Sequence, residues 1–243
     1  MNHLLDARLL CAASFVRADA VLADVGTDHA YLPIALLADG RIRYAYAADI
    51  ARGPLASARE HLAACAAELP GLEDRIRLVL TDGLCGLDHY APAVTDITVC
   101  GMGGELIARI LADAPFVRDG GIRLILQPMT MQAYLRVWLG ENGFAVEAER
   151  LCRTANGKLY TVLCCRFTGD SYVPVHPILG DALLADEENG ALLGAYLTEM
   201  ARRLGRIVDG KRGAGEECRA ESEALSCANT LLERMCNDKH EGE

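Results

Sequence analysis

The stretch Val21-Leu-Ala-Asp-Val-Gly-Thr-Asp-His-Ala-Tyr-Leu-Pro33 decides the fold, because an apolar run passes through an acid and a glycine into a helical pattern. Residues 21–25 have the continuous apolar character of a buried parallel strand. Gly26 marks the change of pattern, since a residue without Cβ lets the backbone approach a ligand closely. Taken alone, the segment fits a cofactor-binding turn as well as an ordinary turn in which Thr27 or Asp28 caps a helix.

The strand-to-helix pattern of this segment repeats along the chain. After an expected helix at 4–17 and the first strand, apolar runs predict strands that alternate with helices, and Asn156-Gly157 is typical of a hairpin turn. The order predicts a doubly wound, mostly parallel seven-stranded α/β sheet of the Rossmann-like type within residues 1–170. The further strands are expected at 44–50, 76–80, 96–100, 122–126, 144–151 and 159–167.

Acids and glycines follow the predicted parallel strands at the points where they end. Because open α/β sheets bind ligands at the carboxyl ends of their strands, five such turns in succession predict a cofactor site there. Asp49 lies about 20 residues beyond the glycine turn, the spacing at which an acid accepts hydrogen bonds from ribose hydroxyls. The residues at these ends are Asp24 and Gly26, Asp49, Asp82 and Gly83, Gly101 to Gly104, and Gln127 with Pro128.

The pattern changes near residue 178, and residues 178–243 are expected to form a helical extension. Apolar residues recur at helical spacing over 193–207 and again over 224–235, with a link at 209–215, which predicts a two-helix hairpin. The hairpin could pack on the domain, clamp a substrate or form a dimer contact. Its apolar stripe is short, so we favour packing or a clamp and expect a monomer.

Composition and charge limit the class of protein. Hydrophobic residues make up 51% of the 243 residues, no apolar stretch is long enough to span a bilayer, and the first residues lack a signal-peptide pattern, so we expect a cytoplasmic protein without a membrane segment. The ten cysteines form no CxxC pair, which favours buried thiols over a metal site. The net charge of −10 argues against a polyanionic partner unless basic residues gather locally.

The turn chemistry points to one cofactor. The segment after the first strand lacks G-x-G-x-x-G, and the chain lacks G-x-x-x-x-G-K-[ST], so a dinucleotide or a kinase-type phosphate site is not expected. Asp24 and Asp28 would repel phosphates but suit a charged amine. The polarity therefore predicts S-adenosylmethionine.

Several motifs together resemble the bacterial tRNA (adenine-22 N1)-methyltransferases, which are class I S-adenosylmethionine-dependent enzymes with a C-terminal helical extension. The resemblance covers about residues 4–167, and the combination of motifs is specific although each motif alone is weak. It implies methyl transfer to N1 of adenine 22 in tRNA, with no metal. The motifs are Asp24-Val-Gly-Thr-Asp-His-Ala-Tyr-Leu-Pro33, Asp49-Ile50 followed by Gly53-Pro54-Leu55, Thr81-Asp-Gly-Leu84, Cys100-Gly-Met-Gly-Gly104 and Leu124-Ile-Leu-Gln-Pro128.

The resemblance also implies roles for single residues. Asp24 and Gly26 would line the methionine moiety, Asp49 with Ile50 beside it would hold the ribose, and Asp82 with Gly83 would contact the adenine of the cofactor. Gly101, Met102, Gly103 and Gly104 would form the wall between the cofactor and the target base. Many adenine methyltransferases place an N-P-P-Y type motif at this wall, whereas this chain has Gly-Met-Gly-Gly. Because N1 of adenine carries a lone pair and no proton, positioning can suffice without a general base.

Asp28 and His29 are the candidates for polar assistance in catalysis, for instance by accepting a hydrogen bond from the adenine N6 amine. Tyr31 or Met102 could stack on an unpaired base, and Gly104, Gln127 and Pro128 are further candidates for substrate contact. Structural roles compete with each assignment: His29 could fix the turn, Tyr31 could belong to the core, and Gln127 could cap the strand end.

Two other functions are compatible with the residues. A methyltransferase of the same fold could act on a small molecule or a protein, which the acidic net charge favours and which the absence of a basic patch at the cofactor mouth would support. A nonenzymatic module could bind S-adenosylmethionine and present the helical hairpin to a partner.

Overall fold

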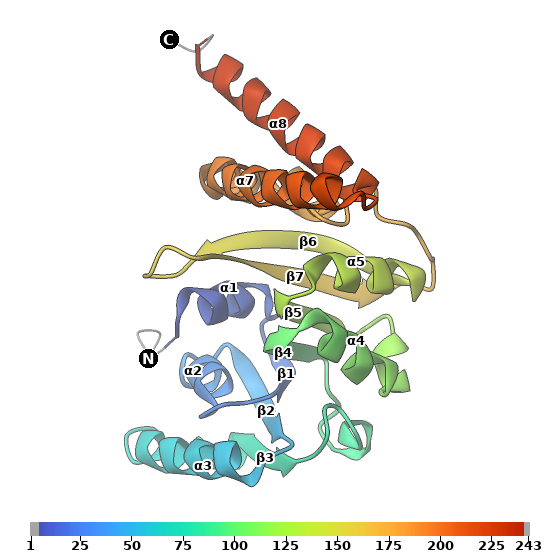
Figure 1. The fold of residues 1–243 in the computed structure, drawn as a ribbon. Coiled ribbons are helices and arrows are strands. Elements are labelled where there is room, and N and C mark those ends of the chain that lie inside the picture. Colours follow the sequence, from blue (N-terminus) through green and yellow to red (C-terminus); the bar gives the residue numbers. More distant parts are fainter. Residues whose placement is uncertain (1–4, 241–243) are drawn as a thin grey trace.

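A computed structural model describes residues 5–240 of the protein as a seven-stranded sheet with helices on both faces and a helical extension beyond one edge (Figure 1). The strand order is β3-β2-β1-β4-β5-β7-β6. The first five strands are parallel, and β7 runs antiparallel to β5 and β6. The predicted fold class is confirmed. The strands are β1 (Ala20–Val25), β2 (Ile42–Asp49), β3 (Ile76–Leu80), β4 (Asp96–Gly103), β5 (Arg123–Thr130), β6 (Phe144–Arg153) and β7 (Leu159–Phe167).

The central strand β1 is buried on both faces, as its continuous apolar run predicted. Leu22 belongs to the hydrophobic cluster on one face, and its neighbour Ala23 belongs to the cluster on the other. The first cluster includes residues of α1 (Ala7–Phe15), α2 (Tyr31–Ala38) and α3 (Arg52–Ala66), and the second includes residues of α4 (Gly104–Ala112) and α5 (Gln132–Glu141). Burial of this kind leaves only the strand ends available for polar groups.

The first helix is shorter than the expected 4–17 and begins after Asp6, whose carboxylate accepts hydrogen bonds from the backbone N–H groups of Arg8 and Leu9 at 3.0 Å each. Residue 4 lies outside the described residues. The helix crosses β5, β7 and β6, so its first turn lies near the strand ends of that half of the sheet (Figure 1).

The extension contains α6 (Asp181–Ala185), α7 (Gly190–Ala214) and α8 (Arg219–His240), and α7 and α8 pack on each other around a third hydrophobic cluster (Figure 1). The predicted link at 209–215 is wrong, because α7 continues through it and ends at Gly215, which has a φ of +72°. Each glycine costs about 1 kcal/mol relative to alanine inside a helix. The burial of Val208 and the Lys211–Glu221 ion pair at 2.6 Å stabilise the continued helix against that cost.

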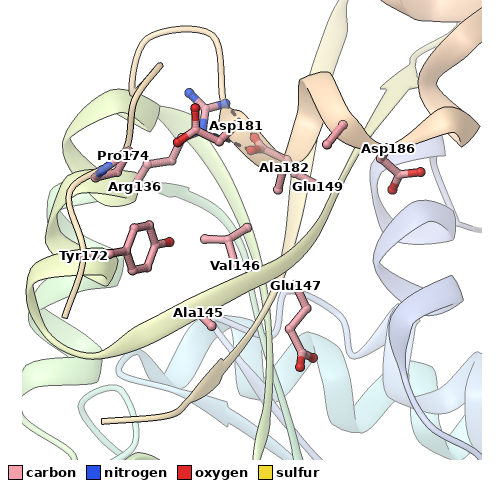
Figure 2. Close-up of a pocket in the computed structure, with 11 residues that line it drawn as sticks. Arg136, Ala145, Val146, Glu147, Glu149, Tyr172, Pro174, Asp181, Ala182 and Asp186 are labelled. Carbon is pink, nitrogen blue, oxygen red and sulfur yellow. Dashed lines mark hydrogen bonds and ion pairs between the residues drawn. The ribbon is translucent and has the colours of Figure 1, made fainter. Parts of the chain in front are cut away.

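A buried ion pair joins the sheet to the segment that leads into the extension. Arg136 of α5 donates to both carboxylate oxygens of Glu149 on β6, at 2.6 and 3.1 Å, and its remaining amino group donates to the carbonyl oxygens of Pro177 and Ile178. Figure 2 shows the pair at the wall of a cavity of about 470 Å³. Burial alone would lower the pKa of Arg136, but the Glu149 carboxylate outweighs it and raises that pKa.

None of the helices within residues 5–240 is both long enough and apolar enough to cross a membrane.

The Glu149→Gln variant should lower the free energy of unfolding by about 3 kcal/mol, because it leaves the buried Arg136 charge without a counter-ion. Glu147→Gln is the matched control. Glu147 lies two residues before Glu149 on β6 and pairs with Arg166 of β7 in a partly exposed position. That control should cost about 1 kcal/mol or less. Urea unfolding followed by circular dichroism measures both, and equal losses would contradict a structural role for the buried pair.

Candidate functional site

The candidate site lies at the carboxyl ends of β1 and β4, where the strand order of the sheet reverses direction. Ligands bind at this position in open α/β sheets because the loops diverge there and leave a crevice. A cavity of about 450 Å³ occupies it. Six of the residues that the sequence singled out line this cavity, namely Asp24, Gly26, Asp28, Tyr31, Gly101 and Gln127.

Asp24 supplies a buried carboxylate to the cavity wall. Its side chain is 7% exposed and accepts a hydrogen bond of 2.7 Å from the Thr98 hydroxyl on the neighbouring strand β4. Burial raises the pKa of Asp24, and the Thr98 hydrogen bond opposes that shift only in part. A carboxylate held in such a place is stabilised by a cation, so the wall suits a ligand with an ammonium group.

The turn after β1 keeps the backbone open at Gly26. The N–H groups of Gly26 and Thr27 donate to the carbonyl oxygen of Ala48 at 2.9 and 3.0 Å, which ties the turn to β2. Gly26 has a φ of +74°, and a Cβ at this position would lie 2.1 Å from Cε of Met102. The turn therefore favours glycine for its backbone conformation, while the flexible end of the Met102 side chain packs against the open side of this residue.

Strained backbone follows at His29 and Ala30, which have φ values of +59° and +52°. The interpretation of Thr27 or Asp28 as a helix cap is wrong, because Ala30 precedes α2 in the left-handed conformation and no side chain caps the helix. Two consecutive residues of this kind cost about 1–3 kcal/mol each and persist where the surroundings hold them.

An aromatic cluster holds this turn. Tyr31 stacks on His29 with ring centroids 5.2 Å apart and meets His61 of α3 at 4.7 Å. Nδ1 of His61 lies 2.8 Å from the carbonyl oxygen of His29. These contacts are the ones expected if His29 serves to fix the turn. Nε2 of His29 also lies 3.4 Å from the exposed Asp28 carboxylate. Tyr31 combines a packed ring with a place in the cavity wall.

The opposite wall depends on Gln127, which is fully buried. Its Oε1 accepts a hydrogen bond of 3.0 Å from the N–H of Gly101, and its Nε2 donates to the carbonyl oxygen of Pro128 at 3.2 Å. The oxygen and the nitrogen of the Gln127 amide therefore both form hydrogen bonds within the protein, as expected if Gln127 caps the end of its strand. Gly101 itself has a φ of +79° at an irregularity in the β4–β5 pairing.

The remaining residues of the Gly-rich wall lie around the cavity without lining it. A Cβ on Gly104 would lie 2.4 Å from the carbonyl oxygen of Met131, so this glycine permits close packing of α4. Gly103 would similarly meet the Thr130 hydroxyl at 3.2 Å. Pro128 is buried in β5, where it pairs with Met102.

The expected ribose and adenine contacts lie on an open rim beside the cavity. Asp49 ends β2, and its Oδ1 accepts a hydrogen bond of 2.7 Å from the N–H of Ala51. Ile50 is 66% exposed. The N–H of Thr81 donates to the carbonyl oxygen of Asp49, so Asp82 and Gly83 at the end of β3 follow directly beside it. The structure brings these four residues together at adjacent strand ends.

Three polar residues of the cavity were not among the site residues predicted from sequence: Asp6, Arg8 and Cys100. The Arg8 guanidinium pairs with Asp6 at 2.5 Å and lies 5.4 Å from the ring centroid of Tyr160. A helix cap at Asp6 is visible in the sequence, but the placement of α1 beside the site depends on tertiary packing. Burial raises the pKa of Cys100, so this thiol stays protonated in the cavity wall. Within residues 5–240, no group of three His, Cys, Asp or Glu side chains is arranged to hold a metal ion.

Comparison with known proteins agrees with this geometry. Residues 5–163 match the model of a family described as a methyltransferase domain. The chain is 34% identical over 208 residues to the tRNA (adenine(22)-N(1))-methyltransferase of Bacillus subtilis, an alignment that covers 82% of this chain and 83% of the relative.

Two solved structures extend the similarity to the whole fold. The m1A22 tRNA methyltransferase of B. subtilis superposes with a TM-score of 0.71 at 30% identity, over 94% of this chain and 96% of that chain. A Streptococcus pneumoniae protein assigned as a tRNA (m1A22) methyltransferase, in complex with S-adenosyl-L-methionine, superposes with a TM-score of 0.74 at 34% identity, over 90% of this chain and 98% of that chain.

The Asp24→Asn variant should be more stable than the wild type at pH 7 in the absence of any ligand. The pKa of Asp24 is raised in the folded state, so the native state binds more protons than the unfolded state between the ordinary value of 3.8 and the folded pKa. Stability from this group therefore falls as the pH rises through that window, and asparagine avoids the loss. We expect a Tm about 2–4 °C higher.

Thermal melts at pH 7 and at the lowest pH where both proteins stay folded would measure this, and the gain should shrink at acidic pH. Asp28→Asn is the control, because Asp28 is exposed and its replacement should leave the Tm unchanged. A loss of stability in Asp24→Asn at pH 7 would contradict the assigned cost of burying the Asp24 charge.

Proposed function

The chain belongs to the tRNA (adenine(22)-N(1))-methyltransferase family, and we propose that it transfers the methyl group of S-adenosylmethionine to N1 of adenine 22 in tRNA. One observation carries this proposal. Two of the segments that carry the family resemblance, 24–33 and 100–104, each contribute residues to the wall of the same cavity, from the ends of β1 and β4. The reaction would take place in the cytoplasm, and we expect the enzyme to act as a monomer.

The residues of the cavity fit S-adenosylmethionine. Asp24 offers a buried carboxylate to the ammonium group, and Gly26, which has no side chain, exposes the backbone of the turn to the cavity. On the rim, Asp49 would accept hydrogen bonds from the ribose hydroxyls, with Ile50, Asp82 and Gly83 beside the adenine. When bound, the cofactor supplies an electrophilic methyl group on a sulfonium.

The target base needs orientation more than proton removal. N1 of adenine has a lone pair in the ring plane, so the protein has to hold the base in line with the methyl group and exclude water. Asp28 is an exposed carboxylate in the cavity wall, and it would accept a hydrogen bond from the N6 amine as N1 gains positive charge. Tyr31 would contact the base, which must leave its stack to reach the cavity.

The basic residues at the cavity mouth favour tRNA over a small molecule or a protein as the substrate. Arg8 lines the cavity, where it is paired with Asp6, whereas Lys158, whose Nζ lies 5.0 Å from the centroid of the Tyr160 ring that Arg8 also contacts, forms no ion pair among the described residues. Local positive charge of this kind attracts phosphates even on a chain whose net charge is −10. A mouth without a basic patch would have supported the small-molecule or protein alternative.

Incubation of the purified protein with labelled S-adenosylmethionine and unmodified tRNA should label N1 of adenine 22, as mapped by nuclease digestion and mass spectrometry. A tRNA with guanine at position 22 should accept no label, because N1 of guanine carries a proton and lacks the free lone pair. Binding of S-adenosylmethionine without transfer to any tRNA would support the nonenzymatic module and contradict the proposal.

Variants at Asp49 and Asp28 should separate cofactor binding from turnover. Asp49→Ala should raise the Kd for S-adenosylmethionine about tenfold or more, since it removes hydrogen bonds to a charged acceptor. Asp28→Ala should lower kcat by about 10²-fold and change that Kd by less than about twofold. Isothermal titration calorimetry and steady-state kinetics measure the two effects. The reverse ranking would refute both assigned roles.

A further inference from the structure

We propose that Tyr160, Lys158 and Arg203 form a second nucleotide subsite, which holds the nucleotide of the tRNA strand next to the target adenine. The inference rests on the proposed function and extends it, because it names a specific surface for the RNA strand. It also assigns a substrate-binding role to α7, which belongs to the helical extension.

The strand register places Tyr160 at the catalytic edge of the sheet. β7 runs antiparallel to β5, with Leu124 opposite Cys165 and Leu126 opposite Leu163. Continued along both strands, this register brings Tyr160 opposite Met129, two residues beyond the buried Gln127 of the site wall. The tip of the β6–β7 hairpin therefore projects past the carboxyl ends of the strands that form the catalytic cavity (Figure 1).

Two cations flank the Tyr160 ring. The guanidinium carbon of Arg8 lies 5.4 Å from the ring centroid, and Nζ of Lys158 lies 5.0 Å from it. Both cations lie over the ring as cation–π contacts. Sites for single-stranded nucleic acid combine aromatic rings, on which bases stack, with cations that hold the phosphates. Tyr160 is only partly buried, so part of the ring remains accessible.

A cavity of about 220 Å³ opens beside this ring. Its walls include Tyr160 and Lys158 from the hairpin, Gln132 from α5, and Met200 and Arg203 from α7. The cavity thus lies between the methyltransferase sheet and the extension, where both contribute side chains to one surface.

Met129 forms the partition between this cavity and the catalytic one. It lines the smaller cavity, and its Sδ lies 3.3 Å from Nη1 of Arg8 and 3.6 Å from Nε2 of Gln127, both of which line the catalytic cavity. The two cavities are therefore neighbours across a single side chain. Consecutive nucleotides of one strand could occupy them, with the target adenine in the larger cavity.

The charges around the smaller cavity favour a phosphate-bearing ligand. Among residues 5–240, neither Lys158 nor Arg203 forms an ion pair, whereas the Arg136 charge at the same cavity is neutralised by Glu149. Glu199 is the remaining carboxylate in the wall, so cations predominate. On a protein with a net charge of −10, two cations without ion-pair partners beside a partly exposed aromatic ring form a local attraction for an RNA strand.

The test compares the Lys158→Ala/Arg203→Ala double variant with the wild type in tRNA binding at several salt concentrations. We expect the Kd for tRNA to rise about tenfold and the slope of log Kd against log salt to fall by about 2, one for each phosphate that the variant no longer binds. The Kd for S-adenosylmethionine should change by less than about twofold. Arg118→Ala is the matched control, because Arg118 lies 6.0 Å from the centroid of the Phe167 ring, at the opposite end of β7 from Tyr160.

Tyr160 is tested by the pair Tyr160→Phe and Tyr160→Leu. Phenylalanine keeps the stacking surface and should retain the KM for tRNA, whereas leucine should raise that KM about tenfold with kcat nearly unchanged. Thermal melts identify any variant that fails to fold. If Tyr160→Leu does not fold, the KM of Tyr160→Phe for tRNA still tests the subsite, because this variant keeps the aromatic ring.

Unchanged tRNA affinity and salt dependence in the double variant would overturn the subsite while leaving the proposed function intact, provided that the wild type methylates tRNA. An equal loss of tRNA affinity in the double variant and in Arg118→Ala would indicate general electrostatic attraction and would also overturn the subsite. Absence of methylation by the wild type would contradict the proposed function itself.

Discussion

Burial of β1 on both faces is the constraint on which the rest of the structure depends. A strand covered by two hydrophobic clusters has no place for a charged group along its length, so polar chemistry is confined to the end where the sheet opens. Asp24 occupies that end, and the Thr98 hydroxyl stabilises its carboxylate across the β1–β4 pairing. The strand order reverses direction between β1 and β4, so the connections that follow these two strands lie on opposite faces of the sheet. Their divergence leaves a crevice, and the Asp24 carboxylate borders it.

Residues whose role depends on local chain geometry could be predicted from the sequence. The apolar run at 21–25, the glycine at 26 and the acids at strand ends all follow from periodicity and backbone conformation, and the structure places them at one edge. The helical extension was also predicted, except for residues 209–215. That stretch contains three glycines, but tertiary packing and the Lys211–Glu221 ion pair stabilise a helix that local propensity disfavours.

Residues whose role depends on packing between distant segments could not be predicted. Arg8 and Tyr160 are about 150 positions apart in the chain, and they meet because α1 crosses β5 and β7. The role of Gln127 is a similar case, because the sequence is compatible with both a contact to the base and a cap on the strand end. In the structure, the pairing of β4 with β5 is irregular at Gly101, and the N–H of Gly101 donates a hydrogen bond to the Gln127 amide oxygen. The contacts of His61 on α3 with the Tyr31 ring and with the carbonyl oxygen of His29 likewise join α3 to the start of α2, which no local pattern connects.

Net charge is a poor guide to the partner of this protein because the field that a ligand meets is local. At 0.15 M ionic strength the Debye length is about 8 Å, so exposed acids elsewhere on the surface are largely screened from a ligand at the cavity mouth. Several of the basic side chains are also neutralised where they stand, as Arg166 is by Glu147 and Arg136 is by Glu149. What an approaching strand meets is therefore set by the few cations that lack such partners. An acidic surface elsewhere then disfavours nonspecific adhesion of polyanions, and Lys158 and Arg203, which form no ion pair among the described residues, supply the positive charge beside the catalytic cavity.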